Sequence, residues 1–379
     1  MTNPRIVSVE WARLEGRRPR NAGSNARLGE HGIAVRVPIL RITTADGASG
    51  FGAYHGSPQR VGELLGTSFD DLFSSTGAVP ERWQPFEYAI WDLAGVRAGK
   101  PIYALAAELA GREVQEPFRA PCYDTSLYFD DLHLHSQSTA AELIATEARA
   151  GYERGHRAFK IKVGRGARHM PLEEGTRRDI AIVRAVREAI GPAAPIMLDA
   201  NNGYNLNLTK RVLSETADCG ILWMEEAFHE DDVLYHDLRE WLAKEDLRIL
   251  IADGEGQADP RLLQWARAGL IDVIQYDIFG YGFTRWLTLG RELDGTGVRS
   301  APHHYGGHYG NYAASHLAAA IQGFTYVEWD EATTEGLDAS RYTVRDGWVA
   351  IPAAPGFGLK LDEAAFERAI ERDGLRRTI

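Results

Sequence analysis

The chain has 379 residues, 44% of them hydrophobic and 25% charged, which are the proportions of a soluble globular protein. The net charge of -11 argues against general binding to nucleic acid or to an anionic membrane. Two cysteines, Cys122 and Cys219, are too few for a disulfide framework, and no apolar run reaches the roughly 18 residues of a membrane span. The first residues also lack the apolar stretch of a secretory signal, so we expect a cytoplasmic protein of about two domains.

The N-terminal part of the chain predicts a meander of strands. β-Branched residues mark strands at residues 6–13 and 33–44, and the turn at residues 45–47 leads into a further strand that ends near Tyr54. Residues 16–32, between the first two strands, are rich in Gly, Asn and Arg and have no apolar period. We therefore expect a mobile loop there.

Two helices and then a repeating pattern follow. From residue 85 to residue 110 apolar side chains recur at helical spacing, with an interruption at residues 99–101. After about residue 119 short apolar runs alternate with amphipathic segments, which is typical of βα units around a parallel sheet. The runs are residues 122–128, 158–163, 196–198, 221–224, 249–252, 273–276, 298–301 and 326–327. Eight units favour a (β/α)8 TIM-type α/β barrel, and an open doubly wound sheet is the alternative that the sequence does not exclude.

Nearly every apolar run after residue 190 ends in an ionisable residue. These residues are Asp199, Glu225, Glu255, Asp277, His303 and Glu328. The carboxyl ends of the strands of a parallel barrel lie on one face, where active sites are found. Side chains that are far apart in the sequence would therefore converge on one pocket.

Three consecutive strand ends carry carboxylates, namely Asp199, Glu225 and Glu255, with no obvious cation to neutralise them. Unpaired carboxylates repel one another and are costly to bury. A divalent metal ion resolves this conflict, and ligands that are all oxygen favour Mg2+ over zinc. The alternative is that each carboxylate caps the following helix or faces solvent.

Lys160 and Lys162 are two apart on the second run and so point to the same side. A lysine pair directed into a barrel is costly to bury unless its charge is used. Each cation lowers the pKa of the other, and a neutral lysine can act as a base. The alternative is an edge strand with two solvated lysines.

His303 and Asp277 could form a pair in which the carboxylate fixes the imidazole tautomer and raises its basicity. His304 and His308 lie close by in the sequence, so a zinc site is an alternative, although no cysteine is near them. The chain has no Gly-x-Ser-x-Gly elbow, no Gly-x-x-x-x-Gly-Lys loop and no complete Gly-x-Gly-x-x-Gly. Hydrolase, nucleoside-triphosphate and dinucleotide-binding functions therefore lose their main support.

In their order and spacing these residues resemble the enolase superfamily, and within it the mandelate racemase subgroup. The matching segments are Ala-Ile-Trp-Asp-Leu-Ala-Gly at 89–95, Gly-Lys-Pro at 99–101, Lys160-Ile-Lys162, Leu198-Asp-Ala-Asn201, Trp223-Met-Glu-Glu226, Gly254-Glu255, Asp277, Ala301-Pro-His303 and Glu328. The resemblance implies a modified (β/α)7β barrel over residues 119–344. It also implies an α+β capping domain of residues 1–118, to which residues 345–379 return.

The resemblance implies Mg2+ held by Asp199, Glu225 and Glu255, with Asn201 near the metal. The chain also departs from the family pattern in three places. Ala227 stands where the family usually has proline, and Gly280-Tyr-Gly282 replaces the common Gly-Gly after Asp277. The longer connection before Glu255 makes Asp253 an alternative ligand, and His304 is an alternative to His303.

The chemistry implied by the resemblance is removal of the proton α to a carboxylate. Mg2+ and Lys160 would stabilise the resulting enediolate, and Glu328 would donate a hydrogen bond to it if protonated. Lys162 and His303 would stand on opposite faces of the α-carbon as base and acid. We expect dehydration of an aldonate or aldarate to a 2-keto-3-deoxy acid. Alternatives are a racemase or epimerase, a lactone cycloisomerase, a Schiff-base aldolase that uses Lys162, and a non-catalytic binding protein.

Substrate choice is expected to depend on segments that fold over the barrel mouth in the family. These are residues 16–32 and the segment around Tyr54 and His55. Arg20 and the other arginines of residues 16–32 could bind a second carboxylate, and a solvated loop is the alternative. The expected partner is a small sugar acid, and homo-oligomers are usual among relatives.

Overall fold

Eight short parallel strands form a ring in the computed structural model, which describes residues 3–74, 76–304 and 307–379. The strands follow the order β11-β4-β5-β6-β7-β8-β9-β10, and a bridge between Ser300 and Phe324 closes the ring just before β11. The strands are β4 (Arg119–Leu127), β5 (Phe159–Lys162), β6 (Ile196–Asp199), β7 (Ile221–Glu225), β8 (Leu250–Asp253), β9 (Val273–Ile274), β10 (Arg299–Ser300) and β11 (Val327–Trp329). Each strand overlaps one predicted run, so the barrel is confirmed and the open sheet is wrong.

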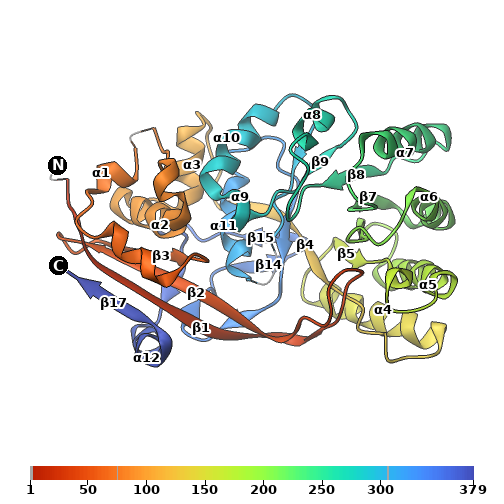
Figure 1. Ribbon diagram of the computed structural model, residues 1–379, viewed down its shortest axis with the longest axis horizontal. Helices are drawn as coiled ribbons and strands as arrows, with labels where there is room; N and C mark the ends of the chain where they lie inside the picture. Colours follow the sequence, from red (N-terminus) through yellow and green to blue (C-terminus); the bar gives the residue numbers. More distant parts are fainter. Residues whose placement is uncertain (1–2, 75, 305–306) are drawn as a thin grey trace.

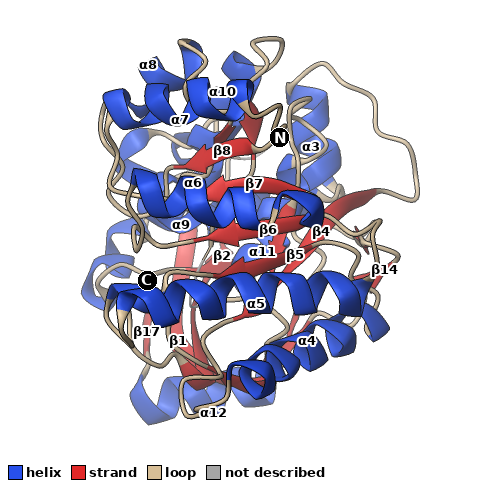
Figure 2. Ribbon diagram, turned by 90° about the vertical axis from the view of Figure 1, so that its right-hand side faces the viewer, coloured by secondary structure: helices blue, strands red, loops and turns tan. Residues whose placement is uncertain are grey.

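Helices lie outside the ring, in the connections between consecutive strands (Figure 2). They are α4 (Gln137–Glu153), α5 (Leu172–Ile190), α6 (Leu206–Glu215), α7 (Asp232–Lys244), α8 (Leu262–Arg267), α9 (Ile278–Tyr281), α10 (Phe283–Leu293) and α11 (Tyr309–Leu317), with short 3-10 turns η3 (Arg165–Ala167) and η4 (Ala217–Cys219). Ser136, Asn205 and Asp231 cap α4, α6 and α7 by accepting hydrogen bonds from first-turn N–H groups. Among the described residues, no helix has the length and apolar character needed to cross a membrane.

A layer of apolar side chains fills the interior of the ring. Every strand, or the residue beside it, contributes one member: Tyr123, Ala158, Met197, Trp223, Ala252, Val273, Ala301 and Tyr326. Side chains of a strand alternate between its two faces, so the residue two positions further along each strand also points inward. That next layer lies nearer the carboxyl ends of the strands.

An antiparallel sheet and its helices form a second layer, at the left of Figure 1. Its strands are β1 (Ile6–Ala22), β2 (Gly32–Thr44), β3 (Ser49–Ala53), β12 (Thr333–Thr334) and β17 (Leu375–Thr378), and its helices are α1 (Phe69–Leu72), α2 (Glu87–Ala98), α3 (Ile102–Leu109) and α12 (Glu363–Asp373), with η1 (Pro58–Leu64) and η2 (Glu81–Phe86). The predicted helical pair after residue 85 corresponds to α2 and α3. We call this layer the capping layer.

The C-terminal part of the chain contacts both layers. Strands β14 (Thr343–Arg345) and β15 (Trp348–Ala350) form a hairpin that pairs antiparallel with the start of β4. Strands β13 (Leu337–Asp338) and β16 (Lys360–Leu361) pair with each other. The final strand β17 then pairs antiparallel with β1 in the capping layer. The two ends of the chain therefore lie in one sheet.

Of residues 16–32, for which we expected a mobile loop, only residues 23–31 lie outside the strands, so the expectation is wrong for residues 16–22. Strand β1 continues to Ala22 and β2 begins at Gly32, and the two pair along this stretch with one irregularity. The turn between them lies against the barrel, where the carbonyl of Ser24 accepts a hydrogen bond from the N–H of Phe129 at 2.9 Å. This ribbon is held by cross-strand bonds and contacts with the barrel, so it needs no apolar period. We call β1, β2 and their turn the hairpin.

Candidate active site

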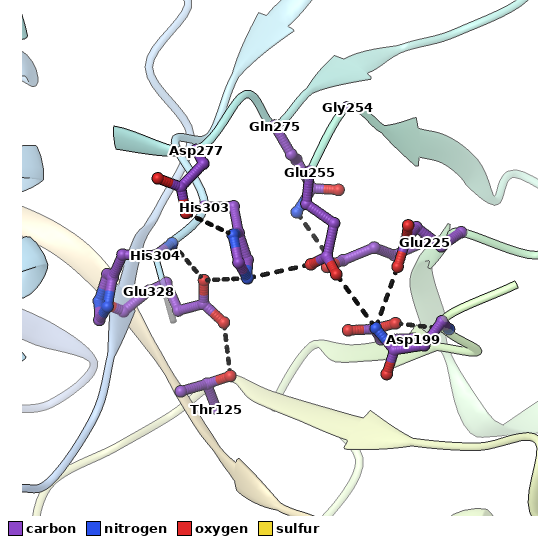
Figure 3. A network of polar contacts seen from close by, with 12 residues as sticks. Thr125, Asp199, Glu225, Gly254, Glu255, Gln275, Asp277, His303, His304 and Glu328 are labelled. Carbon is purple, nitrogen blue, oxygen red and sulfur yellow. Dashed lines mark hydrogen bonds and ion pairs between the residues drawn. The ribbon is translucent and has the colours of Figure 1, made fainter. Parts of the chain in front are cut away.

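A polar layer lies two residues beyond the apolar layer of the barrel (Figure 3). Its members are Thr125, Lys160, Asp199, Glu225, Gly254, Gln275, His303 and Glu328. Each follows its apolar counterpart by two positions, so strand alternation places all of them inside the ring. The apolar layer below and the polar layer above make the barrel mouth the chemically active end.

The three carboxylates that were predicted as metal ligands lie together. We call Asp199, Glu225 and Glu255 the carboxylate group. One oxygen each of Asp199, Glu225 and Glu255 lies within 4.8 Å of the other two. Gly254 adopts a φ of +128°, a conformation that glycine adopts without strain, immediately before Glu255. The alternative ligand Asp253 accepts hydrogen bonds from the hydroxyl of Tyr235 at 2.5 Å and from the N–H of Gly254 at 2.7 Å.

The three carboxylates lie close enough to repel one another. Burial raises the pKa of Glu225 to about 7; Lys160 opposes this rise, while Asp199 and Glu255 add to it. Mutual repulsion of this kind marks a site that a further cation would stabilise. Carboxylate oxygens are the ligands that Mg2+ prefers, so the residues present fit this ion. The other possible ligand group among the described residues lies exposed on α7.

Both lysines of β5 point into the carboxylate group. The Nζ of Lys160 lies 2.8 Å from Glu225, 2.9 Å from Glu328 and 3.4 Å from Asp199. The Nζ of Lys162 donates to Asp199. The solvated edge strand is therefore wrong, because both side chains are buried.

The expectation that the lysines lower each other's pKa does not describe this arrangement. Burial and Lys160 act to lower the pKa of Lys162, but the carboxylates of Asp199, Glu255 and Glu225 together outweigh them, and the pKa lies above its ordinary value. The pKa of Lys160 is also raised, because Glu225 and Glu328 outweigh the effect of burial. The carboxylates outnumber the lysines, so attraction exceeds the repulsion between the two cations.

His303 lies between carboxylates on two sides. Its Nδ1 is 3.2 Å from Asp277, and its Nε2 is 3.0 Å from Glu255 and 3.8 Å from Glu328. Burial acts to lower the pKa of His303, but Glu255 and Glu328 outweigh burial and hold the pKa well above its ordinary value. His303 is therefore an imidazolium that can donate a proton.

The other two histidines have structural contacts. His304 Nε2 lies 2.7 Å from the carbonyl oxygen of Glu328, and its N–H donates to the Glu328 carboxylate at 3.0 Å. His308 Nε2 lies 3.1 Å from the hydroxyl of Thr334. The described residues do not bring these histidines together with His303 as metal ligands. The structure thus favours His303 over His304 and gives the zinc alternative no support.

Glu328 does not meet the condition on which it was expected to donate a hydrogen bond, namely that it is protonated. Burial acts to raise its pKa, but Lys160 and His303 outweigh burial and hold the pKa well below its ordinary value. The hydroxyl of Thr125 donates to Glu328 at 2.6 Å, and the N–H of His304 donates to its other oxygen. Glu328 is thus a carboxylate that accepts hydrogen bonds and anchors Lys160.

Asn201 joins the carboxylate group, together with a residue that the sequence analysis did not select. Its side-chain amide donates to Glu226 at 3.0 Å and to Glu255 at 3.2 Å, and its backbone N–H donates to Asp199 at 2.9 Å. Burial, with Glu255 and Asp199, raises the pKa of Glu226 to about 10. Glu226 was missed because its φ of +41° breaks the strand alternation that identifies the other members.

Thr125 and Gln275 were also missed. Gln275 donates to Glu225 at 2.9 Å, and Thr125 holds Glu328. Neither side chain ionises, so a search for ionisable strand ends passes over both. Counting two residues onward from each inward apolar residue finds them.

Two of the expected substrate-binding residues lie away from this group. Arg20 forms ion pairs with Asp130 at 2.5 Å and Glu147 at 3.1 Å, and it also donates to the carbonyl of Ser126. Its guanidinium is occupied by carboxylates of the barrel, so binding of a substrate carboxylate by Arg20 has no support. Tyr54 is buried in the capping layer, where its ring stacks on Phe86.

His55 lies at the edge of the site. Its ring centroid is 4.4 Å from that of Phe279, two residues after Asp277. Burial lowers the pKa of His55, although the charge of Asp277 opposes this. His55 is thus a mostly neutral group that the capping layer contributes beside the Asp277–His303 pair.

Comparison with known proteins places this arrangement among related sites. Residues 143–365 match the family described as enolase C-terminal domain-like. A solved galacturonate dehydratase from Geobacillus sp., complexed with D-galacturonate and 5-keto-4-deoxy-D-galacturonate, is 48% identical over 100% of both chains, with a TM-score of 0.94. A mandelate racemase/muconate lactonizing protein from Geobacillus sp. Y412MC10, complexed with magnesium/tartrate, is 49% identical over 100% of this chain and 98% of that one, with a TM-score of 0.97. The arabinonate dehydratase of Saccharolobus solfataricus is 26% identical over 369 residues, 90% of this chain and 91% of its own.

Proposed function

This chain belongs to the enolase superfamily, and from that premise we propose that it is a Mg2+-dependent hydro-lyase that dehydrates a sugar acid. The predicted resemblance to the mandelate racemase subgroup is confirmed by the similar solved structures, and the relatives named above include two dehydratases. We select D-galacturonate as the substrate to test first. The galacturonate dehydratase supports this choice because it resembles this chain over its whole length.

The observation that carries the proposal is that two groups able to transfer a proton contact different members of the carboxylate group. Lys162, on β5, contacts Asp199, while His303, after β10, lies 3.0 Å from Glu255. A substrate carboxylate held at the centre would present its α-carbon between these two side chains. This placement fits a reaction that removes one proton and delivers another.

In the proposed reaction, Lys162 first gives up its own proton, which the Asp199 carboxylate would hold less strongly once that carboxylate is a metal ligand. The neutral Nζ of Lys162 then takes the proton from the α-carbon. The electrons of that C–H bond move into the substrate carboxylate, which gives an enediolate dianion. They then return to form the α,β double bond as the β-carbon–oxygen bond breaks with its electron pair on oxygen. His303 gives its Nε2 proton to that oxygen, which leaves as water. The resulting enol takes up a proton at the β-carbon and loses the proton of its hydroxyl, which gives the keto acid. Lys160 stabilises the negative charge on the substrate carboxylate during these steps.

Asp199, Glu225 and Glu255 would hold Mg2+, which supplies a positive charge beside the substrate carboxylate and so lowers the cost of forming the dianion. Asn201 orients two of these carboxylates through its amide and backbone N–H groups. Asp277 holds the imidazole of His303 with its Nε2 directed at the mouth. Trp223 and Gln275 donate to Glu225 at 3.0 and 2.9 Å and fix its orientation.

A uronate extends the product class that we expected from the sequence. In an aldonate, loss of the α-proton and the β-hydroxyl gives a 2-keto-3-deoxy acid. In a hexuronate the carboxylate is at C6, so the same elimination removes the C5 proton and the C4 hydroxyl. The product is then a 5-keto-4-deoxy acid, the kind named for the ligand of the galacturonate dehydratase.

The proposal is tested with a panel of D-galacturonate, D-glucuronate, an aldarate and an aldonate, each with Mg2+ and with EDTA. We expect a Mg2+-dependent keto-deoxy acid from D-galacturonate, measured as the semicarbazone and identified by NMR. Deuterium at the α-carbon in D2O without a keto product would indicate an epimerase instead. A borohydride-trapped adduct on Lys162 that forms without metal would indicate an aldolase. No reaction or exchange with any acid would contradict an enzymatic role. Homo-oligomer formation stays a prediction.

A further inference from the structure

The segment that carries Asp277 has little support from the barrel sheet. Strands β9 and β10, on either side of the Asp277–His303 pair, are two residues long each. One oxygen of Asp277 caps α9, accepting from the N–H groups of Phe279 at 2.8 Å and Gly280 at 2.7 Å. Only the other oxygen faces His303, at 3.2 Å. The direction of the Asp277 carboxylate is therefore tied to the position of α9.

Packing fixes the outer side of α9 only in part, through ring contacts of Phe279 with His55 and Tyr88. A cavity of about 390 Å³ lies there, between the capping layer and the start of α10. Phe279, Gly280 and Tyr281 of α9 line it together with His55 and Tyr88 of the capping layer. Side chains that border a cavity lack contacts on that side, so they resist displacement less than those in a filled core.

Hydrogen bonds from α2 add to the bond that the N–H of Ile278 donates to the carbonyl of His303 at 2.7 Å. The hydroxyl of Tyr88 donates to the carbonyl of Ile278, the residue next to Asp277. The carboxylate of Glu87 accepts from the N–H groups of Phe283 at 2.7 Å and Thr284 at 2.8 Å, which begin α10. These bonds attach both ends of α9 to one helix of the capping layer. Tyr88 makes the bond nearer to Asp277.

We propose that Tyr88 is a positioning residue for the Asp277–His303 pair. By fixing the carbonyl of Ile278, its hydroxyl sets the position of α9, and α9 in turn sets the direction of the Asp277 carboxylate. The capping layer thus controls the orientation of an acid that the barrel itself carries. This inference rests on the proposed function, because it assigns His303 a proton-transfer role.

The test compares two variants that lose the same chemical group. Tyr88→Phe removes the hydroxyl and keeps the ring contacts with Phe279 and Tyr309. Tyr342→Phe removes another buried tyrosine hydroxyl that donates to a backbone carbonyl, that of Phe357 at 2.6 Å. Tyr342→Phe also removes the contact of the hydroxyl with His316, so this control variant loses at least as many hydrogen bonds as Tyr88→Phe does. The Tm and the steady-state kinetics of each variant and of the unchanged protein are measured with Mg2+.

We expect Tyr88→Phe to lower kcat about ten-fold and to change KM less than two-fold, since a small displacement of a proton donor slows the reaction without weakening binding. Tyr342→Phe should keep kcat within two-fold of the unchanged protein, at an equal or greater loss of Tm. In an Asp277→Asn background, Tyr88→Phe should add less than a two-fold loss, because the group through which it acts is gone.

Two results would overturn the inference. One is a kcat for Tyr88→Phe within two-fold of the unchanged protein or of Tyr342→Phe. The other is a ten-fold loss that persists in the Asp277→Asn background. Failure of the proposed function is distinguishable, because the unchanged protein would then produce no keto acid in the same assay.

Discussion

The two halves of the site are held in different ways. Strands of four or five residues carry Lys160, Lys162, Asp199 and Glu225, and four residue pairs join β5 to β6 and four join β6 to β7. Asp277 and His303 instead lie beyond strands of two residues, and they meet through one isolated bridge. We call these the strand half and the turn half. Sheet register places the strand half, whereas hydrogen bonds within turns and from α2 place the turn half.

The difference suggests that substitutions have different effects in the strand half and in the turn half. A side chain on a paired strand cannot turn to the other face without a shift of register, so its direction is fixed by the whole ladder. A side chain on a turn depends on a few bonds, each of which one substitution can remove. Loss of a residue from the strand half should remove a charge without moving its neighbours. Changes around the turn half should move the acid without removing it.

The largest effect is expected for Asp199→Asn in the strand half. The variant removes a buried charge between Lys162 and the other two carboxylates, so we expect Mg2+ binding to fail and turnover to fall by about 1,000-fold or more. The rise in Tm on addition of Mg2+ should disappear with it. Asp218→Asn, an exposed carboxylate paired with Arg184, is the control and should keep both. Normal Mg2+-dependent turnover in Asp199→Asn would remove Asp199 from the metal site.

The next effect compares the proton-transfer groups across the two halves. We expect Lys162→Ala and His303→Asn each to lower keto acid formation by about 100-fold to 10,000-fold, the usual contribution of a positioned acid or base. His303→Asn should still exchange the α-proton in D2O, because Lys162 remains in place. Lys162→Ala should lose that exchange. Exchange that survives in Lys162→Ala and fails in His303→Asn would reverse the two assignments.

Most of the fold and the strand half could be predicted because both follow from the repeat of apolar runs and amphipathic segments along the chain. Eight apolar runs indicated eight strands, and charged residues at their ends indicated which face is open. Lys160, Asp199 and Glu225 each lie two residues beyond an inward apolar residue. The position of each residue at the end of its apolar run can be read from the sequence. A parallel barrel then brings all the strand ends to one face, so no other contact has to be known.

The remaining parts depend on contacts between segments far apart in the sequence. Residues 16–32 looked like a loop because their support comes from the barrel and from cross-strand bonds. Arg20 looked like a ligand for substrate because its partners Asp130 and Glu147 lie more than 100 residues away. The pKa directions of Lys162 and Glu328 depend on how many opposite charges surround each group, which spacing alone does not give.

The capping layer also reaches the barrel through the hairpin, and this contact should matter for stability rather than turnover. Arg20→Met leaves Asp130 and Glu147 facing each other without their shared cation. We expect the free energy of unfolding to fall by about 2 kcal/mol, since removal of one partner strands a partly buried charge. KM for the substrate should change less than two-fold. A KM increase of ten-fold or more, with unchanged stability, would restore the substrate-binding role expected from the sequence.

The smallest effect concerns the same contact and depends on pH. Burial raises the pKa of Glu147 to about 8; Arg20 opposes this rise, and the nearby charge of Asp130 adds to it. Because this pKa exceeds that of the unfolded chain, near 4.5, the group stabilises the fold fully at low pH. That contribution is lost as the pH rises through about 8. Glu147→Gln, which mimics the neutral acid, should remove this loss.

Urea unfolding at pH 5, 7 and 9 measures the difference. The Glu147→Gln variant should have nearly the stability of the unchanged protein at pH 5 and exceed it by at least about 1 kcal/mol at pH 9. Glu142→Gln, an exposed residue on the same helix α4, is the control and should show a constant difference at all three pH values. An equal pH dependence in both variants would mean that Glu147 is ionised in the fold. In that case Arg20 would stabilise two ionised carboxylates, Asp130 and Glu147, as the two lysines stabilise the ionised carboxylates of the strand half.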